Sequence, residues 1–161
     1  MKNIKVWSNQ ESYLNNRKSF IKIFDKVSNS SQIILGPQVK NFENAFSKFT
    51  GNKYGVGVNS GTDALEVILM ALGVGHGDEV ITTSNTAVPT VSAIVSCNAK
   101  PVFVDCDDTF CMNVNQLESK ITKKTKAIVP VHFTGSMVNM IKLAKIGKKY
   151  KIPIVEDACQ S

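Results

Sequence analysis

The first third of the chain has hydrophobic positions at helical spacing. Between residues 1 and 28, apolar side chains recur every three or four residues, as they do on one face of an α-helix. They include Tyr13, Leu14, Phe20, Ile21, Phe24 and Val27. A second such stretch opens at Gly36-Pro37, with proline as its first helical residue, and stops at Gly51. The pattern predicts two amphipathic helices, separated by a polar break at residues 28–31.

After Lys53 the pattern changes to short apolar runs that alternate with helical segments. The expected strands are Tyr54–Val58, Glu79–Thr82, Pro101–Asp105, Ala127–His132 and Ile152–Glu156. The expected helices are residues 62–72, 88–97, 113–122 and 137–150. Strands without polar alternation, separated by helices, predict an α/β fold with a mostly parallel sheet and helices on both faces. Pro130 has no N–H, so its strand is expected to be bulged or less central than its composition suggests.

The stretch Asn59–Leu65 joins the first expected strand to an apolar helix. Ser60 is a good N-cap, and Asp63 three residues later completes a Ser-x-x-Asp capping pattern. A helix start presents free backbone N–H groups and the positive end of the helix dipole, which favours a bound phosphate. An ordinary capped helix without a ligand fits the same residues. Polar residues also follow the other strands, where open α/β sheets bind ligands. These residues are Ser84-Asn85-Thr86, Asp105, His132 and Glu156-Asp157.

Composition and charge argue against several classes of function. The net charge of +6 comes from lysine, because Arg17 is the only arginine, and nothing resembles a nucleic-acid groove. The four cysteines lack C-x-x-C spacing, so we expect reduced thiols and no metal site. No apolar stretch reaches the length of a signal peptide or a membrane span, so we expect a cytoplasmic protein without membrane association. Ser60 replaces the third glycine of a dinucleotide fingerprint, which argues against a nicotinamide cofactor.

Five motifs in register resemble a known family. They are Asn-Ser-Gly-Thr-Asp-Ala-Leu at 59–65, Gly-Asp-Glu-Val-Ile at 77–81, Ala-Lys-Pro-Val-Phe-Val-Asp at 99–105, Thr-Lys-Ala-Ile-Val-Pro-Val-His at 125–132 and Val-Glu-Asp-Ala-Cys-Gln-Ser at 155–161. Together they resemble the amino-terminal part of the DegT/DnrJ/EryC1/StrS sugar aminotransferases. The resemblance implies the large domain of a fold type I enzyme that uses pyridoxal 5′-phosphate. It also implies a nucleotide-linked 3- or 4-keto sugar as substrate, in deoxyamino sugar biosynthesis for surface polysaccharide.

The resemblance also implies which residues bind the cofactor. Gly61 and Thr62 match the family's phosphate-binding residues, and Gln160 matches the residue that hydrogen-bonds the phenolic oxygen. Asp157 matches the partner of the pyridine nitrogen; a structural acid that caps a following helix is the alternative. Ala87 stands where many relatives carry an aromatic residue that stacks on the ring, so stacking is expected to be weaker or to come from elsewhere.

The family's Schiff-base lysine lies beyond the position of Ser161, so no catalytic residue is assigned within this chain. We expect an amino-terminal fragment of a longer enzyme, inactive alone, with residues 1–35 as a helical arm and residues 36–161 as an incomplete cofactor-binding large domain. The resemblance implies glutamate as amino donor and a homodimer at full length. A pyridoxamine-dependent sugar dehydratase of the same family, with histidine at the lysine position, and a non-catalytic remnant are the alternatives.

Overall fold

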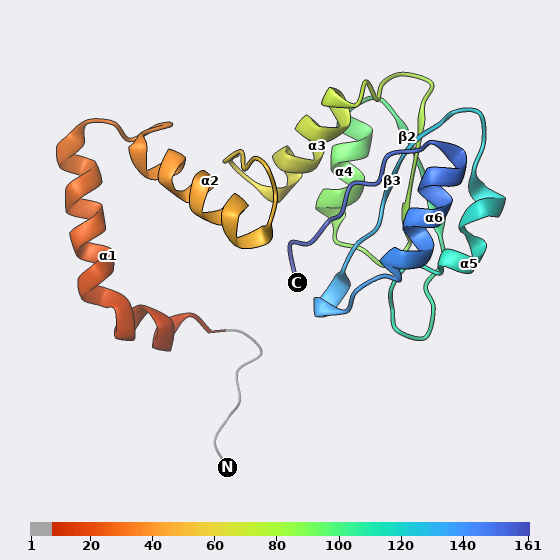
Figure 1. Ribbon diagram of the computed structural model, residues 1–161. Coiled ribbons are helices and arrows are strands. Elements are labelled where there is room, and N and C mark those ends of the chain that lie inside the picture. Colours follow the sequence, from red (N-terminus) through yellow and green to blue (C-terminus); the bar gives the residue numbers. More distant parts are fainter. Residues whose placement is uncertain (1–7) are drawn as a thin grey trace, which may run out of the picture. The chain divides into compact units, whose positions relative to one another are not determined.

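The computed structural model describes residues 8–161, which divide into two compact units (Figure 1). The first unit ends at Gly57, and its described part contains α1 (Gln10–Ser30) and α2 (Pro37–Thr50). Both helices were predicted, although residues 1–7 of the first predicted segment lie outside the described residues. Neither helix contains a buried residue, so their apolar faces are open to solvent in this structure. The second unit comprises Val58–Ser161.

The predicted strand Tyr54–Val58 is wrong, because none of these residues is in a strand. The backbone N–H of Gly57 donates instead to the Glu43 carboxylate of α2, at 2.8 Å. This hydrogen bond also lowers the pKa of the Glu43 carboxyl group. This apolar run is therefore held next to α2 by a hydrogen bond to a side chain and not by a neighbouring strand. Its two glycines also add little apolar surface that a sheet could bury.

The sheet of the second unit has three parallel strands in the order β2-β1-β3. They are β1 (Glu79–Thr83), β2 (Lys100–Val104) and β3 (Thr125–Val129). All five residues of β1 are buried, as expected for the central strand of a parallel sheet. These strands confirm three of the five predicted runs to within a few residues.

Helices cover both faces of this sheet, as predicted (Figure 1). Because side chains alternate along a strand, Val80 packs on one side and Ile81 on the other. Val80 belongs to a cluster with residues of α3 (Gly61–Ala71) and α4 (Val88–Ser96). Ile81 belongs to a cluster with residues of α5 (Val114–Leu117) and α6 (Met140–Tyr150).

The predicted strand Ile152–Glu156 is present only as isolated bridges, at Ile154 and Asp157. The Asp157 N–H donates to the Pro130 carbonyl at 2.9 Å, and the His132 N–H donates to the Asp157 carbonyl at 3.0 Å. Pro130 and Pro153 each lack a donor, which interrupts the ladder that a regular strand needs. β3 accordingly ends at Val129, immediately before Pro130.

Two predicted helices differ in length from the structure. Residues 113–122 form the short α5 followed by the 3₁₀ turn η1 (Glu118–Lys120), and residues 137–150 become helical only from Met140. In the second case Asn139 supplies the cap, because its side-chain oxygen accepts the Lys142 N–H at 3.0 Å. A second 3₁₀ turn, η2 (Phe133–Gly135), follows His132.

A few features of the described part of the chain bear on possible functions. None of its helices has the length and apolar character required to cross a membrane. Within residues 8–161, no group of three or more histidine, cysteine or acidic side chains is placed to hold a metal ion. All four cysteines are free.

Candidate functional site

A cavity of about 210 Å³ lies in the second unit, and all five predicted site residues line it. These are Gly61, Thr62, Ala87, Asp157 and Gln160. Its other lining residues are Leu65, Pro89, Thr90, Val131, His132, Phe133 and Cys159. The fold therefore brings together segments almost 100 residues apart in sequence. The cofactor contacts assigned to these residues remain predictions.

A larger hollow of about 680 Å³ lies in the first unit, along residues 31–40. Among residues 8–161, Lys40 is its one ionisable lining residue, and the lining includes the exposed apolar side chains Ile33, Ile34 and Leu35. Binding sites for small molecules usually combine an apolar lining with several convergent polar groups. The smaller cavity has that combination and is the better candidate for a chemical site.

One end of the candidate site is the start of α3. The Ser60 hydroxyl accepts the Asp63 N–H at 3.1 Å, which confirms the predicted cap. The N–H groups of Gly61 and Thr62, in the first turn, have no acceptor within the helix. A methyl group on Gly61 would lie 2.7 Å from Cys159 Sγ, so glycine lets the 159–160 segment approach the helix start. This end of the cavity suits an anion.

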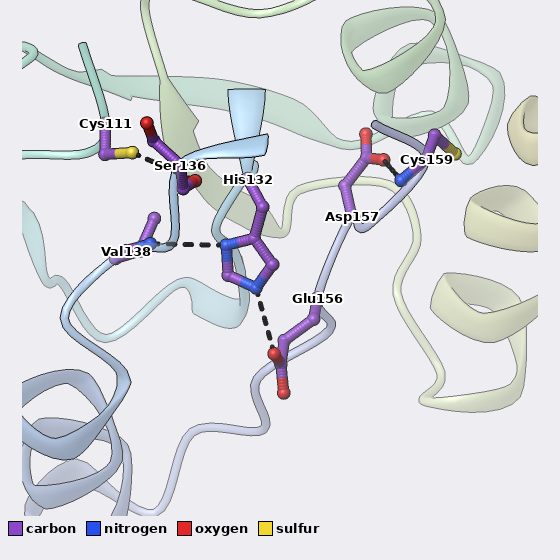
Figure 2. A network of polar contacts seen from close by, with 7 residues as sticks. All are labelled: Cys111, His132, Ser136, Val138, Glu156, Asp157 and Cys159. Carbon is purple, nitrogen blue, oxygen red and sulfur yellow. Dashed lines mark hydrogen bonds and ion pairs between the residues drawn. The ribbon is translucent and has the colours of Figure 1, made fainter. Parts of the chain in front are cut away.

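Asp157 supplies a buried carboxylate, with only 8% of the residue exposed. Its Oδ2 accepts the Thr90 hydroxyl proton at 2.7 Å. Its Oδ1 accepts the Cys159 N–H at 3.3 Å (Figure 2). Backbone hydrogen bonds to Pro130 and His132 fix the place of Asp157 beside the segment that follows β3. A turn follows Asp157 at residues 159–160.

His132 is 3% exposed and is bonded through both ring nitrogens (Figure 2). Nδ1 accepts the Val138 N–H at 3.3 Å, so the ring proton belongs on Nε2, which lies 3.0 Å from Glu156 Oε2. The His132 ring therefore links the segment that follows β3 to Val138, which precedes α6, and to Glu156, the neighbour of Asp157. With both nitrogens hydrogen-bonded, His132 shapes the wall of the cavity and offers no free lone pair to a metal ion.

Cys159 and Gln160 complete the wall next to Asp157. A hydrogen bond to the Asp157 carboxylate, together with burial, raises the pKa of the Cys159 thiol, so the sulfur stays protonated near neutral pH. The Gln160 amide oxygen accepts the Thr134 N–H at 2.9 Å. Its amide nitrogen therefore remains the end that can donate, as the predicted contact with a phenolic oxygen requires.

Ala87 lines the cavity as the residue before α4, and its methyl group offers no stacking surface. Phe133 and the imidazole of His132 are the aromatic side chains among the lining residues that the structure describes. The sequence did not mark Phe133 or Thr90 as site residues. For Thr90 a weak signal existed, since Thr86 and Thr90 are four residues apart around a helix start.

Comparison with known proteins shows the family of the chain. The sequence profile of the DegT/DnrJ/EryC1/StrS aminotransferase family matches residues 15–161. The chain belongs to this family. It is 41% identical, over 99% of its length, to a "pleiotropic regulatory protein" from Geobacillus stearothermophilus. It is also 41% identical, over 97% of its length, to a dTDP-3-amino-3,4,6-trideoxy-alpha-D-glucose transaminase from Micromonospora megalomicea subsp. nigra. The chain spans 43% and 42% of the lengths of these two relatives.

Two solved structures of the family share the fold. DesV from S. venezuelae, in complex with a ketimine intermediate, superposes with a TM-score of 0.96 at 33% identity, covering 100% of this chain and 44% of that one. The Bacillus subtilis protein NtdA, with bound cofactor PMP, gives a TM-score of 0.89 at 33% identity, covering 91% of this chain and 34% of that one. The predicted fold class, part of the large domain of a fold type I aminotransferase, is confirmed.

Proposed function

We propose that this chain forms the cofactor-binding portion of a sugar aminotransferase that uses pyridoxal 5′-phosphate. The observation that carries the proposal is one cavity lined by both a helix start with free N–H groups and a buried carboxylate. The first feature suits a phosphate and the second suits a protonated ring nitrogen. The proposal agrees with the bound PMP of the NtdA structure.

Each of these residues would have a distinct task. The N–H groups of Gly61 and Thr62, with the Thr62 hydroxyl, would hold the phosphate. Asp157 would keep the ring nitrogen protonated, and Gln160 would donate to the phenolic oxygen. Ala87 would limit contact on its side of the ring to van der Waals packing. When bound, pyridoxal phosphate supplies an electron sink for a carbanion, and a protonated ring strengthens that sink.

The lysine that the family uses is absent from the lining of this cavity, within the residues that the structure describes. We propose that residues 1–161 bind cofactor groups but do not catalyse transamination without a lysine from elsewhere. The proposed substrate is a nucleotide-linked 3- or 4-keto sugar with glutamate as amino donor, which agrees with the dTDP-sugar transaminase among the relatives. A homodimer in the cytoplasm completes the proposal, and four free cysteines fit a reducing compartment.

The phosphate site can be tested with Thr62→Val in the full-length protein. The hydroxyl donates to a charged acceptor, a contribution of roughly 1.5–3 kcal/mol, so the dissociation constant of pyridoxal phosphate should rise about 10- to 100-fold. Thr50→Val, at the exposed end of α2, is the matched control and should bind like the parent. Fluorescence titration measures all three proteins. Equal dissociation constants for Thr62→Val and the parent would remove Thr62 from the phosphate site.

A further inference from the structure

The Asp157 carboxylate has a buried partner that the family motifs did not indicate. Thr90, in the first turn of α4, is 1% exposed, and its hydroxyl lies 2.7 Å from Asp157 Oδ2. An ionised carboxylate can only accept hydrogen bonds, so the single hydroxyl proton of Thr90 is committed to Asp157. A short bond from a hydroxyl to a buried charge is stronger than a bond between neutral groups.

A second hydroxyl supports the first. Thr86 Oγ1 lies 2.8 Å from Thr90 Oγ1. Since the Thr90 proton points at Asp157, Thr86 is the donor in this second bond, which is much shorter than the 3.5 Å contact of the same hydroxyl with the Ala87 carbonyl. The result is a directed chain from Thr86 through Thr90 to Asp157, in which each bond polarises the next.

The other carboxylate oxygen is held from a different side. Asp157 Oδ1 accepts the Cys159 N–H at 3.3 Å (Figure 2). The two oxygens are therefore bonded to groups from separate segments. Two bonds from different directions fix the rotation of the carboxylate about its last torsion. A carboxylate can accept about four hydrogen bonds, so capacity remains for a donor in the cavity.

We propose that Thr90 is a positioning residue that sets the orientation of the Asp157 carboxylate toward a ring N–H donor in the cavity. The assignment rests on the proposed function for the identity of that donor, but the orientation itself is a property of the protein alone. Thr90 acts through Asp157, and its hydroxyl is what matters, because valine has the same shape without the donor. Thr86 contributes by polarising the Thr90 hydroxyl.

The test compares Thr90→Val with Thr90→Ser, which keeps the donor. Thr82→Val is the matched control: Thr82 is buried in the same unit and its hydroxyl donates to the Val129 carbonyl at 2.9 Å, away from Asp157. Crystal structures of the full-length proteins without added cofactor report the carboxylate orientation. Titration with pyridoxal phosphate reports retention, with thermal unfolding measured for each protein.

We expect the carboxylate to rotate in Thr90→Val and to keep its orientation in Thr90→Ser and Thr82→Val. Retention of pyridoxal phosphate should weaken about tenfold in Thr90→Val, the lower end of what a bond to a charged group contributes, and recover in Thr90→Ser. If Thr90→Val does not fold, Thr86→Val at its half-buried position decides the matter, with an expected weakening of about twofold from the lost polarisation.

An unchanged carboxylate and unchanged retention in Thr90→Val would overturn the assignment. So would equal weakening in Thr82→Val, because the effect would then follow general loss of stability. For Thr86→Val, retention equal to the parent's would count against the chain of hydroxyls. If none of the proteins binds pyridoxal phosphate, the proposed function fails, while the carboxylate orientation still decides the role of Thr90.

Discussion

The unit that ends at Gly57 and the unit Val58–Ser161 both contain well-formed amphipathic helices, but among residues 8–161 the buried hydrophobic clusters lie in the second unit alone. Phe49, on α2, is 87% exposed, whereas Ile81, on β1, is 0% exposed. Helical spacing and end signals are local properties that form a helix wherever the chain carries them. Burial depends on a second surface that packs against the first. β1 has such a surface on each side, formed by α3 and α4 on one and by α5 and α6 on the other.

The two units also differ at the starts of their helices. Neither α1 nor α2 has a side-chain cap, whereas Ser60, Asn113 and Asn139 each cap a helix of the second unit. A side-chain cap typically contributes about 1 kcal/mol and fixes the path by which the chain enters the helix. The candidate site lies in the unit where the backbone is held both by packing and by caps.

The largest expected effect contrasts a buried residue of β1 with an exposed residue of α2. Ile81→Ala should lower the free energy of unfolding by about 2–5 kcal/mol, because it leaves a cavity between two packed layers. Phe49→Ala should change the same free energy by less than about 0.5 kcal/mol. Urea unfolding followed by circular dichroism measures both variants. Similar costs for the two would show that the Phe49 side chain is packed as tightly as that of Ile81.

A smaller effect is expected from one methyl group at the helix start. In Gly61→Ala the new Cβ meets Cys159 Sγ at 2.7 Å, which should cost about 1–3 kcal/mol of stability and displace the 159–160 segment. Gly75→Ala, which meets nothing within 4 Å, is the control. The stability measured by thermal unfolding should be restored when Cys159→Ala is combined with Gly61→Ala, because the sulfur that the new Cβ meets is then gone. A Gly61→Ala protein as stable as the Gly75→Ala control would mean that this contact is loose.

The smallest expected effect concerns the thiol in the cavity wall. Because the Asp157 carboxylate and burial raise the pKa of Cys159, less of its reactive thiolate is present at any given pH than for an ordinary cysteine. Alkylation of Cys159 by iodoacetamide at pH 8 should therefore be slow and should accelerate in Asp157→Asn, where the negative charge is gone. Peptide mapping measures the rate, with Cys106 as internal reference. An unchanged alkylation rate in Asp157→Asn would show that the Asp157 carboxylate does not raise the pKa of Cys159.

Much of the fold could be predicted from the sequence, because local signals dominate where the prediction succeeded. Pro37 and Gly51 mark the ends of α2, and the apolar run at Glu79–Thr82 is the central strand. The run at Tyr54–Val58 has the same local appearance, but its Gly57 N–H bonds to Glu43, fourteen residues earlier. The local sequence pattern does not predict a hydrogen bond between residues this far apart.

The site could be predicted in part for a similar reason. Gly61 and Asp157 came from motifs whose order along the chain resembles a family, and the structure brings both to one cavity. Thr90 was missed, because its bond to Asp157 spans 67 residues and exists only after the sheet has formed. Its partner Thr86 lies one helical turn earlier, but the spacing of two threonines does not identify a third residue.

The central claim is that one cavity holds a phosphate at the start of α3 and a ring nitrogen at Asp157. A crystal structure of the full-length protein with pyridoxamine 5′-phosphate tests it most directly, since this ligand needs no covalent bond to the protein. The account predicts the phosphate on the N–H groups of Gly61 and Thr62, and the ring nitrogen within hydrogen-bond distance of the Asp157 carboxylate. A phosphate bound away from the start of α3, or a ring nitrogen that faces away from Asp157, would contradict it.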